Sequence, residues 1–327
     1  MKFNILGNTG IKISRLGLGT WSLGGKTPGK TSYGNISKKK SLDIISKSFD
    51  LGINFFDTSP AYGFSEEILG NCFKNKRDKV ILCSKVGMDR YKSKKNFSPK
   101  FIKFQVHKIL KNLKSDYIDF IKMYNPDPND KILVDGYGEL LNLKKRGFIK
   151  HIGVSLQSPS DLIKFDKKIK FEIVQCNFNL LDLRVLEKNF LNKIKKDRIG
   201  LVARTIYCFG VFTEKFIKLN TLKKKLYSKN DHRNRWSKQQ INKWIEGVRE
   251  IKLSLQEKRN TENLATRFVN SYKFISTSLI GVQSEQELKN NINKDNFIPL
   301  SRNKLKKIKL INKKNFFLNR LSPNRIT

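Results

Sequence analysis

Three residues with complementary proton chemistry lie at or just beyond the ends of short apolar runs. Asp57 and Lys85 each end such a run, and Tyr62 follows Asp57 by five positions. An ammonium beside a phenol favours the phenolate and lowers the pKa of the phenol from its reference of about 10. A carboxylate keeps that ammonium charged and holds it in place. The set therefore predicts a tyrosine that exchanges a proton near neutral pH.

Each of these residues also has an ordinary structural explanation. A strand-end aspartate such as Asp57 is often a helix N-cap, and Pro60 fits a turn just after it. A lysine that ends a strand, as Lys85 does, is usually a solvated side chain. The chemical interpretation rests on the three residues together, because active sites of parallel barrels gather at the carboxyl ends of neighbouring strands.

The elements that must position these residues alternate between strand-like and helix-like patterns. Residues 3–6 and 11–13 predict an opening β-hairpin. Short apolar runs then predict buried parallel strands at residues 16–18, 54–57, 80–85, 117–123, 149–155, 173–177, 200–205 and 277–280. Helical patterns predict helices at residues 38–51, 65–73, 99–113, 133–146, 160–167, 186–196 and 284–291, with an extra helix at 238–258.

Eight β/α units favour an α/β fold, a closed (β/α)8 TIM barrel with an N-terminal β-hairpin. A doubly wound open sheet is the alternative, but no GxGxxG motif opens a helix after a strand. We expect the barrel to span residues 1–297 and a basic C-terminal tail to span 298–327, with a helix at 303–311. The sequence does not predict the oligomeric state.

The cysteines, the hydropathy and the net charge bear on whether the protein binds a metal, a membrane or a nucleic acid. The four cysteines are dispersed without metal-binding spacing, which indicates reduced thiols in a cytoplasmic protein without a metal. No apolar run approaches a membrane span, so no membrane partner is expected. Lys and Arg number 67 against 28 Asp and Glu, a net charge of +39 that raises a nucleic-acid hypothesis. The lysines are spread along the whole chain without a nucleic-acid-binding motif, so no specific nucleic acid is expected.

The order of several short blocks resembles the aldo-keto reductase family. The blocks are residues 16–21, 52–63, 65–70, 84–87, 116–120, 125–128, 152–155, 174–177, 210–213 and 280–291. The resemblance extends over about residues 1–295. It implies a (β/α)8 barrel that transfers a hydride reversibly between a nicotinamide cofactor and a small-molecule carbonyl substrate, which is an aldehyde, a ketone or a sugar.

The resemblance also implies roles for individual residues. Tyr62 matches the general acid of carbonyl reduction, Lys85 the residue that lowers its pKa, and Asp57 the residue that holds Lys85. Ser155 and Gln175 match positions that hydrogen-bond the nicotinamide carboxamide. Other positions that match cofactor contacts are Gly19, Thr20, Trp21, Asp57, Arg204, Gly281, Gln283, Glu287 and Asn291.

Two departures from the family pattern bear on function. Tyr124 occupies a position, after the fourth barrel strand, where the family usually has a histidine that orients the carbonyl. A tyrosine hydroxyl also donates a hydrogen bond, so a working enzyme with altered specificity, a slow enzyme and a cofactor-binding sensor or structural subunit all stay open. Gln283 and Glu287 replace the basic residues that often bind the 2′-phosphate of NADPH. NADPH is the expectation from the resemblance, with NADH as a possibility.

Overall fold

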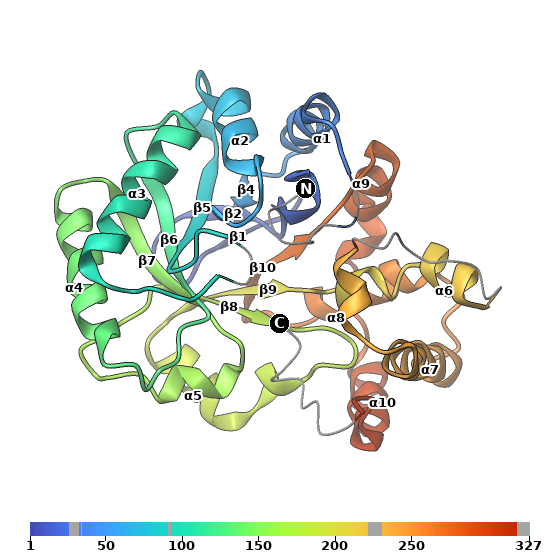
Figure 1. Cartoon of the computed structure of the whole chain (residues 1–327). Coiled ribbons are helices and arrows are strands. Elements are labelled where there is room, and N and C mark those ends of the chain that lie inside the picture. Colours follow the sequence, from blue (N-terminus) through green and yellow to red (C-terminus); the bar gives the residue numbers. More distant parts are fainter. Residues whose placement is uncertain (26–32, 34, 91–92, 222–230, 319–327) are drawn as a thin grey trace.

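Eight parallel strands close into a barrel that helices surround (Figure 1). The computed structural model describes residues 1–25, 33, 35–90, 93–221 and 231–318. The barrel strands are β3 (Leu16–Gly19), β4 (Phe55–Asp57), β5 (Ile81–Val86), β6 (Ile118–Tyr124), β7 (Ile149–Ser155), β8 (Ile173–Asn177), β9 (Gly200–Arg204) and β10 (Ile275–Ile280). The last strand, β10, pairs with β3 and closes the barrel. The predicted TIM barrel is therefore confirmed.

The predicted N-terminal hairpin is confirmed as well. Strands β1 (Phe3–Ile5) and β2 (Lys12–Ser14) pair antiparallel. Leu6, just after β1, and Ile13 of β2 are fully buried in one apolar cluster with Phe55 and Phe120 from the barrel strands. The hairpin thus closes the amino-terminal end of the barrel with apolar side chains, and the carboxyl ends of the strands remain for polar ones.

The helices form with recognisable start signals. They are α1 (Lys38–Asp50), α2 (Ser65–Phe73), α3 (Pro99–Leu113), α4 (Ile132–Lys145), α5 (Lys188–Lys196), α6 (Glu214–Thr221), α7 (Lys238–Ser254), α8 (Thr261–Asn270), α9 (Glu285–Ile292) and α10 (Arg302–Ile311). Ser37 caps α1 and Ser237 caps α7 through their side-chain oxygens, and Pro99 opens α3. None of the described helices is both long and apolar enough to cross a membrane.

One helix prediction was wrong, and the helices α6 and α8 were not predicted. Residues 160–167 do not form an α-helix, because only the 3-10 turn Pro159–Ile163 appears there. The Asp166 side chain then accepts the backbone N–H of Lys168, and such local bonds compete with helix formation. The helix α8 was not predicted, although Asn260 caps it and its apolar face is buried. Its sequence lies just beyond the Lys-rich segment that was interpreted as a loop with one extra helix.

Alternation along each strand decides which side chains reach the barrel interior. In β6, Phe120 belongs to the interior cluster, whereas Ile121 and Met123 pack outward with the helices. Because successive side chains point to opposite faces, Lys122 and Tyr124 share the inward face with Phe120. The strand therefore carries one apolar and two polar inward residues, in order, toward its carboxyl end.

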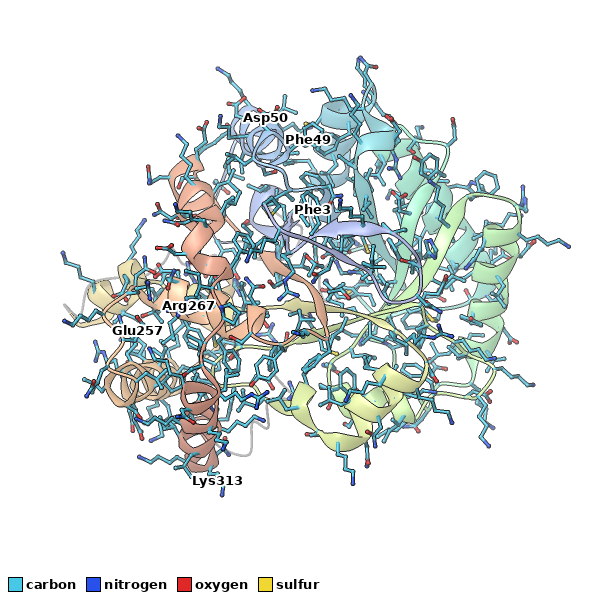
Figure 2. All side chains as sticks on the ribbon, turned by 180° about the vertical axis from the view of Figure 1, so that it is seen from behind. Phe3, Phe49, Asp50, Glu257, Arg267 and Lys313 are labelled. Atoms are coloured by element: carbon cyan, nitrogen blue, oxygen red, sulfur yellow. The ribbon has the colours of Figure 1, made fainter. Side chains whose placement is uncertain are left out.

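The described part of the C-terminal tail lies against the barrel helices. The buried carboxylate of Glu257 accepts from Arg267 of α8 at 3.2 Å and from Lys304 of α10 at 3.3 Å, and Figure 2 shows Glu257 and Arg267 side by side. Gln240 of α7 donates to the Phe316 carbonyl at 2.9 Å. The domain boundary after residue 297 stays a prediction, and residues 319–327 lie outside the described residues.

Replacing Glu172 by Gln is expected to lower the free energy of unfolding by about 2 kcal/mol at pH 7. Burial alone raises the pKa of Glu172, but hydrogen bonds from His151, Lys144 and the Ile152 N–H outweigh it and hold the pKa at about 2. The stabilisation is complete above the unfolded-state pKa of about 4.3 and is lost as the pH falls toward 2.

Urea unfolding of both proteins at pH 7 and pH 3 measures this effect, and the difference should fall to about half at pH 3. Glu67→Gln is the control, because its ion pair with Lys38 is largely exposed and should change stability by less than about 0.5 kcal/mol. Equal loss of stability at both pH values would show that Glu172 acts through packing alone.

Candidate active site

One buried carboxylate at the end of β4 holds two buried ammonium groups. Lys85 of β5 donates from Nζ to Asp57 Oδ2 at 2.7 Å and to the Thr58 carbonyl at 2.7 Å. Lys122 of β6 donates from Nζ to Asp57 Oδ1. The exposed fractions of Asp57, Lys85 and Lys122 are 3%, 1% and 0%. The three side chains therefore form one desolvated ionic cluster inside the barrel.

The charges of this cluster perturb one another. Burial alone raises the pKa of Asp57, but the ammonium groups of Lys122 and Lys85 outweigh burial and keep the pKa below its ordinary value. Burial lowers the pKa of Lys122, and the Asp57 carboxylate offsets part of that effect. Asp57 is thus an anion at any pH near neutrality, with two cationic donors on it.

Two tyrosines lie next to the cluster. The Tyr62 ring is 4.6 Å from Lys85 Nζ and stacks on Trp21 with centroids 5.6 Å apart. Tyr124 ends β6, and its ring is 5.7 Å from the same ammonium. Its hydroxyl is hydrogen-bonded to Tyr62, and burial and then the charge of Tyr62 raise its pKa well above the usual range. Tyr124 therefore keeps its proton, and Tyr62 is the tyrosine placed to lose one.

A cavity of about 430 Å³ begins at these tyrosines. Its volume is within the range of small-molecule sites in proteins. Its lining includes Asp57, Tyr62 and Tyr124 from the site and Gln283 and Glu287 from the start of α9. Other lining residues are Gly19, Trp21, Gln175, Arg204, Tyr207, Phe209 and Gly281. The cavity connects the proton-exchanging groups with the start of α9.

The wall formed by β7 and β8 suits a primary carboxamide. Both side-chain atoms of Gln175, Oε1 and Nε2, are buried and have no hydrogen-bond partner within the part of the chain that the structure describes. The cost of leaving such atoms unpaired indicates a missing ligand. A nicotinamide carboxamide offers one acceptor and one donor group and would satisfy both atoms. Nearby, Ser155 Oγ donates to Asn125 Oδ1 at 3.2 Å.

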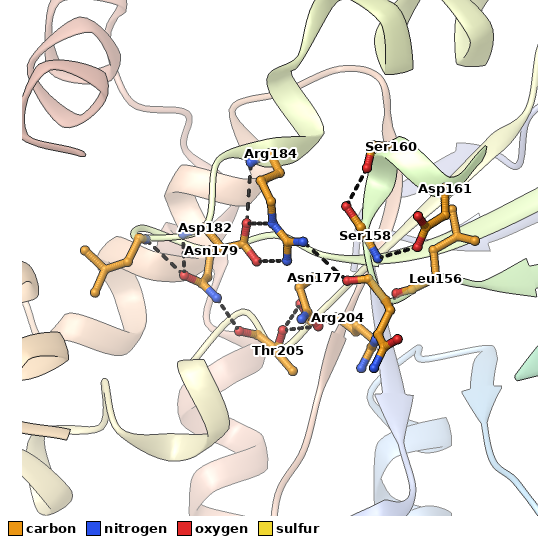
Figure 3. Close-up of polar contacts among 12 residues, drawn as sticks. Leu156, Ser158, Ser160, Asp161, Asn177, Asn179, Asp182, Arg184, Arg204 and Thr205 are labelled. Atoms are coloured by element: carbon orange, nitrogen blue, oxygen red, sulfur yellow. Dashed lines mark hydrogen bonds and ion pairs between the residues drawn. The ribbon is translucent and has the colours of Figure 1, made fainter. Parts of the chain in front are cut away.

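A polar network holds the adjoining end of β9, as Figure 3 shows. Arg204 donates to the Leu156 carbonyl at 3.0 Å, and its Nε is buried without a hydrogen-bond partner among the described residues. Thr205 Oγ1 donates to Asn177 Oδ1 at 2.8 Å, and Asn179 donates to the Thr205 carbonyl at 3.1 Å. The bond to Leu156 holds the Arg204 guanidinium at the cavity wall, and the other two hold Thr205, which follows it.

The far end of the cavity is the N-terminus of α9. Ser284 caps this helix by accepting from the Glu287 N–H at 3.2 Å, and the Glu287 carboxylate accepts from the Gln283 N–H at 2.8 Å. Ser284 is thus an N-cap, and Glu287 folds back onto the backbone of the residue that precedes the cap. A carboxylate of the protein itself therefore occupies one of the backbone donors that an incoming phosphate would otherwise use.

The structure brings most of the predicted residues to one cavity. Three of them make their side-chain bonds elsewhere. Thr20 Oγ1 donates to the Asp57 carbonyl at 3.0 Å, Ser155 bonds Asn125, and Asn291 accepts from the Tyr207 hydroxyl at 2.9 Å. Thr20 thus fixes the backbone at Asp57, and Asn291 supports Tyr207, which lines the cavity.

Sequence reasoning missed two residues, Lys122 and His232. His232 was assigned to a long loop, but its ring is 5.1 Å from that of Trp21, which in turn stacks on Tyr62. Its side chain is fully buried, and neither ring nitrogen has a hydrogen-bond partner in the described ranges. Burial, together with Arg233 and Arg235, lowers its pKa to about 3, so the imidazole is neutral.

Comparisons with known proteins agree with this geometry. The sequence model of the Aldo/keto reductase family matches residues 15–313. Aldo-keto reductase YhdN of Bacillus subtilis is 35% identical over 223 residues, which are 66% of this chain and 65% of that protein, just under two thirds of its length. The structure of the glycerol dehydrogenase AKR11B4 from Gluconobacter oxydans is 26% identical, with a TM-score of 0.76 and coverage of 96% and 95% of the two chains.

Proposed function

Because the chain belongs to the aldo/keto reductase family, we propose that it transfers a hydride reversibly between a nicotinamide cofactor and the carbonyl of an aldehyde, a ketone or a sugar. The observation that carries the proposal is the Tyr62 ring beside the Lys85 ammonium, which is held on Asp57 at the end of a ligand-sized cavity. The cofactor, when bound, supplies or accepts the hydride.

The side chains divide the proton chemistry between them. In reduction the Tyr62 hydroxyl gives its proton to the carbonyl oxygen, and in oxidation the phenolate takes it back. The Lys85 ammonium stabilises the phenolate, and Asp57 fixes the position of Lys85. Tyr124, which stays protonated, donates a hydrogen bond to the same carbonyl oxygen. Trp21, stacked on Tyr62, shields the reacting groups from water.

The residues of the cavity also suggest which cofactor binds. Gln175 would pair with the nicotinamide carboxamide, and Glu287 would face the adenosine ribose. A ribose hydroxyl can donate to the Glu287 carboxylate, whereas a 2′-phosphate would be repelled by it. We therefore propose that NADH binds more tightly than NADPH. This differs from the NADPH preference that the resemblance implies.

A cofactor titration followed by a carbonyl panel tests the proposal. NADH is expected to quench the protein fluorescence with micromolar affinity and NADPH to bind about tenfold more weakly, a difference of about 1.4 kcal/mol. Glu287→Gln should bring the two affinities together. Glu285→Gln, which removes a neighbouring exposed charge of the same helix turn, is the matched control and should leave the ratio unchanged.

The outcomes separate the proposal from its alternative. The alternative, favoured by Tyr124 in place of the usual histidine, is a barrel that binds the cofactor as a sensor or structural subunit. Turnover of any aldehyde, ketone or sugar above the background rate supports the enzyme. Tight cofactor binding without turnover across the panel supports the alternative, and binding of neither cofactor contradicts both.

A further inference from the structure

Lys122 is a buried charge that the proposed chemistry leaves without a role. It lies in the middle of β6, paired in register with Lys85 of β5, and its side chain is fully buried. Strand alternation points it inward between Phe120 and Tyr124, and Tyr124 lines the cavity. Its Nζ donates to Asp57 Oδ1, while Lys85 uses Oδ2 of the same carboxylate.

The charges of this cluster do not sum to zero. With both lysines protonated, Asp57 contributes one negative charge, and Lys85 and Lys122 together contribute two positive charges. Burial lowers the pKa of Lys122, and the Asp57 carboxylate, which accepts from its Nζ, opposes that effect. An excess charge is costly in a desolvated site unless a counter-charge compensates it. The Tyr62 hydroxyl becomes an anion on losing one proton, and the Tyr62 ring lies 4.6 Å from Lys85 Nζ. A Tyr62 phenolate makes the cluster neutral.

We propose that Lys122 is a positioning residue whose positive charge, transmitted through the shared Asp57 carboxylate, favours the phenolate of Tyr62. This inference rests on the proposed function of the same site. If Lys122 is absent, Asp57 and Lys85 neutralise each other, and a Tyr62 phenolate would itself be the excess charge. Tyr62 would then hold its proton more strongly, which hinders oxidation more than reduction.

The other titratable groups around the cluster do not supply the balancing charge. The Cys83 thiol lies next to Lys122, and burial raises its pKa to about 12. Burial raises the pKa of Glu66, which accepts hydrogen bonds from Ser84 and Asn112 on the outer side of β5. Tyr124 keeps its proton, because burial raises its pKa as well. The groups that lie farther away are Arg204, whose charge acts on Tyr124, and Lys108, whose charge acts on Glu66.

The test compares Lys122→Met with Lys122→Gln, which differ in polarity but both remove the charge. Two readouts apply, the pH profile of kcat for alcohol oxidation and the ultraviolet difference spectrum of tyrosinate in the cofactor complex. The Tyr62→Phe protein assigns the signal, because the tyrosinate absorbance that is lost in this variant belongs to Tyr62. Both variants should move the apparent pKa up by about one pH unit and lower oxidation at neutral pH about tenfold, with cofactor affinity unchanged.

Cys83→Ala is the control, because it removes packing volume and a hydrogen bond beside Lys122 without removing a charge. Its apparent pKa should match that of the unaltered protein. An unchanged apparent pKa in a folded Lys122→Met or Lys122→Gln protein overturns the proposal, as does an equal shift in Cys83→Ala. The tyrosinate titration requires no turnover, so it tests Lys122 even if the carbonyl panel contradicts the proposed enzyme.

Discussion

Replacing Tyr62 by Phe is expected to lower kcat about a thousandfold and to change the cofactor dissociation constant less than about threefold. The substitution removes only the hydroxyl that exchanges the proton. The ring that remains keeps its stacking on Trp21 and its contact with the Lys85 ammonium, so the walls of the cofactor cavity should not change. Steady-state rates with the best carbonyl of the panel and a fluorescence titration measure the two quantities.

Tyr137→Phe is the matched control for this experiment. Its hydroxyl donates to the Lys170 carbonyl at 2.7 Å, outside the barrel, and its loss should leave kcat unchanged. Full activity in Tyr62→Phe would mean that another group donates the proton, with Tyr124 as the first candidate. Loss of cofactor binding together with activity would instead indicate that the hydroxyl supports the structure of the cavity.

The strands and the first three site residues were predictable because they depend on local patterns. Buried parallel strands are short apolar runs, and their carboxyl ends meet at one face of a barrel. This topology alone places Asp57 and Lys85 on adjacent strands, with Tyr62 in the loop that follows Asp57. The structure places Asp57 opposite Cys83 of the neighbouring strand, two residues before Lys85. Strand order and register do not fix the side-chain distances, which come from the structure.

Lys122 could have been found by the same reasoning. It is a charged residue inside the strand Ile118–Tyr124, whose residues are all buried, and strand alternation places it on the same face as Tyr124. A buried lysine needs a nearby anion, and Asp57 was the inward carboxylate already identified. The sequence therefore contains the pattern that predicts a buried ionic contact for Lys122, but the apolar run was used only to predict the strand.

The position of His232 and the conformation of residues 160–167 could not be predicted from local sequence patterns. His232 reaches Trp21 across more than two hundred residues of chain, and no periodicity in its loop predicts that contact. Residues 160–167 carry a helical pattern, but Asp166 forms a local turn with Lys168 instead. Tertiary contacts and side-chain competition of this kind override local propensity.

Replacing Tyr124 by Phe is expected to lower kcat/KM about a hundredfold, because it removes the hydroxyl that we propose as a hydrogen-bond donor to the carbonyl oxygen. Burial keeps the Tyr124 hydroxyl protonated, and it is hydrogen-bonded to Tyr62. The hydroxyl therefore keeps its proton throughout the pH range near neutrality. Because Phe fills almost the same volume, the cofactor dissociation constant should not change, and the loss should appear with every carbonyl in the panel.

Tyr124→His is the informative partner of this variant, because it places the residue that the family usually has at this position. It restores a donor of different length, so it should recover activity toward some carbonyls and change the order of preference among them. Equal activity of the Phe and unaltered proteins would show that Tyr124 does not touch the substrate oxygen. In that case the neutral imidazole of His232, above Trp21, becomes the next donor to replace, and His232→Phe is the variant that decides between them.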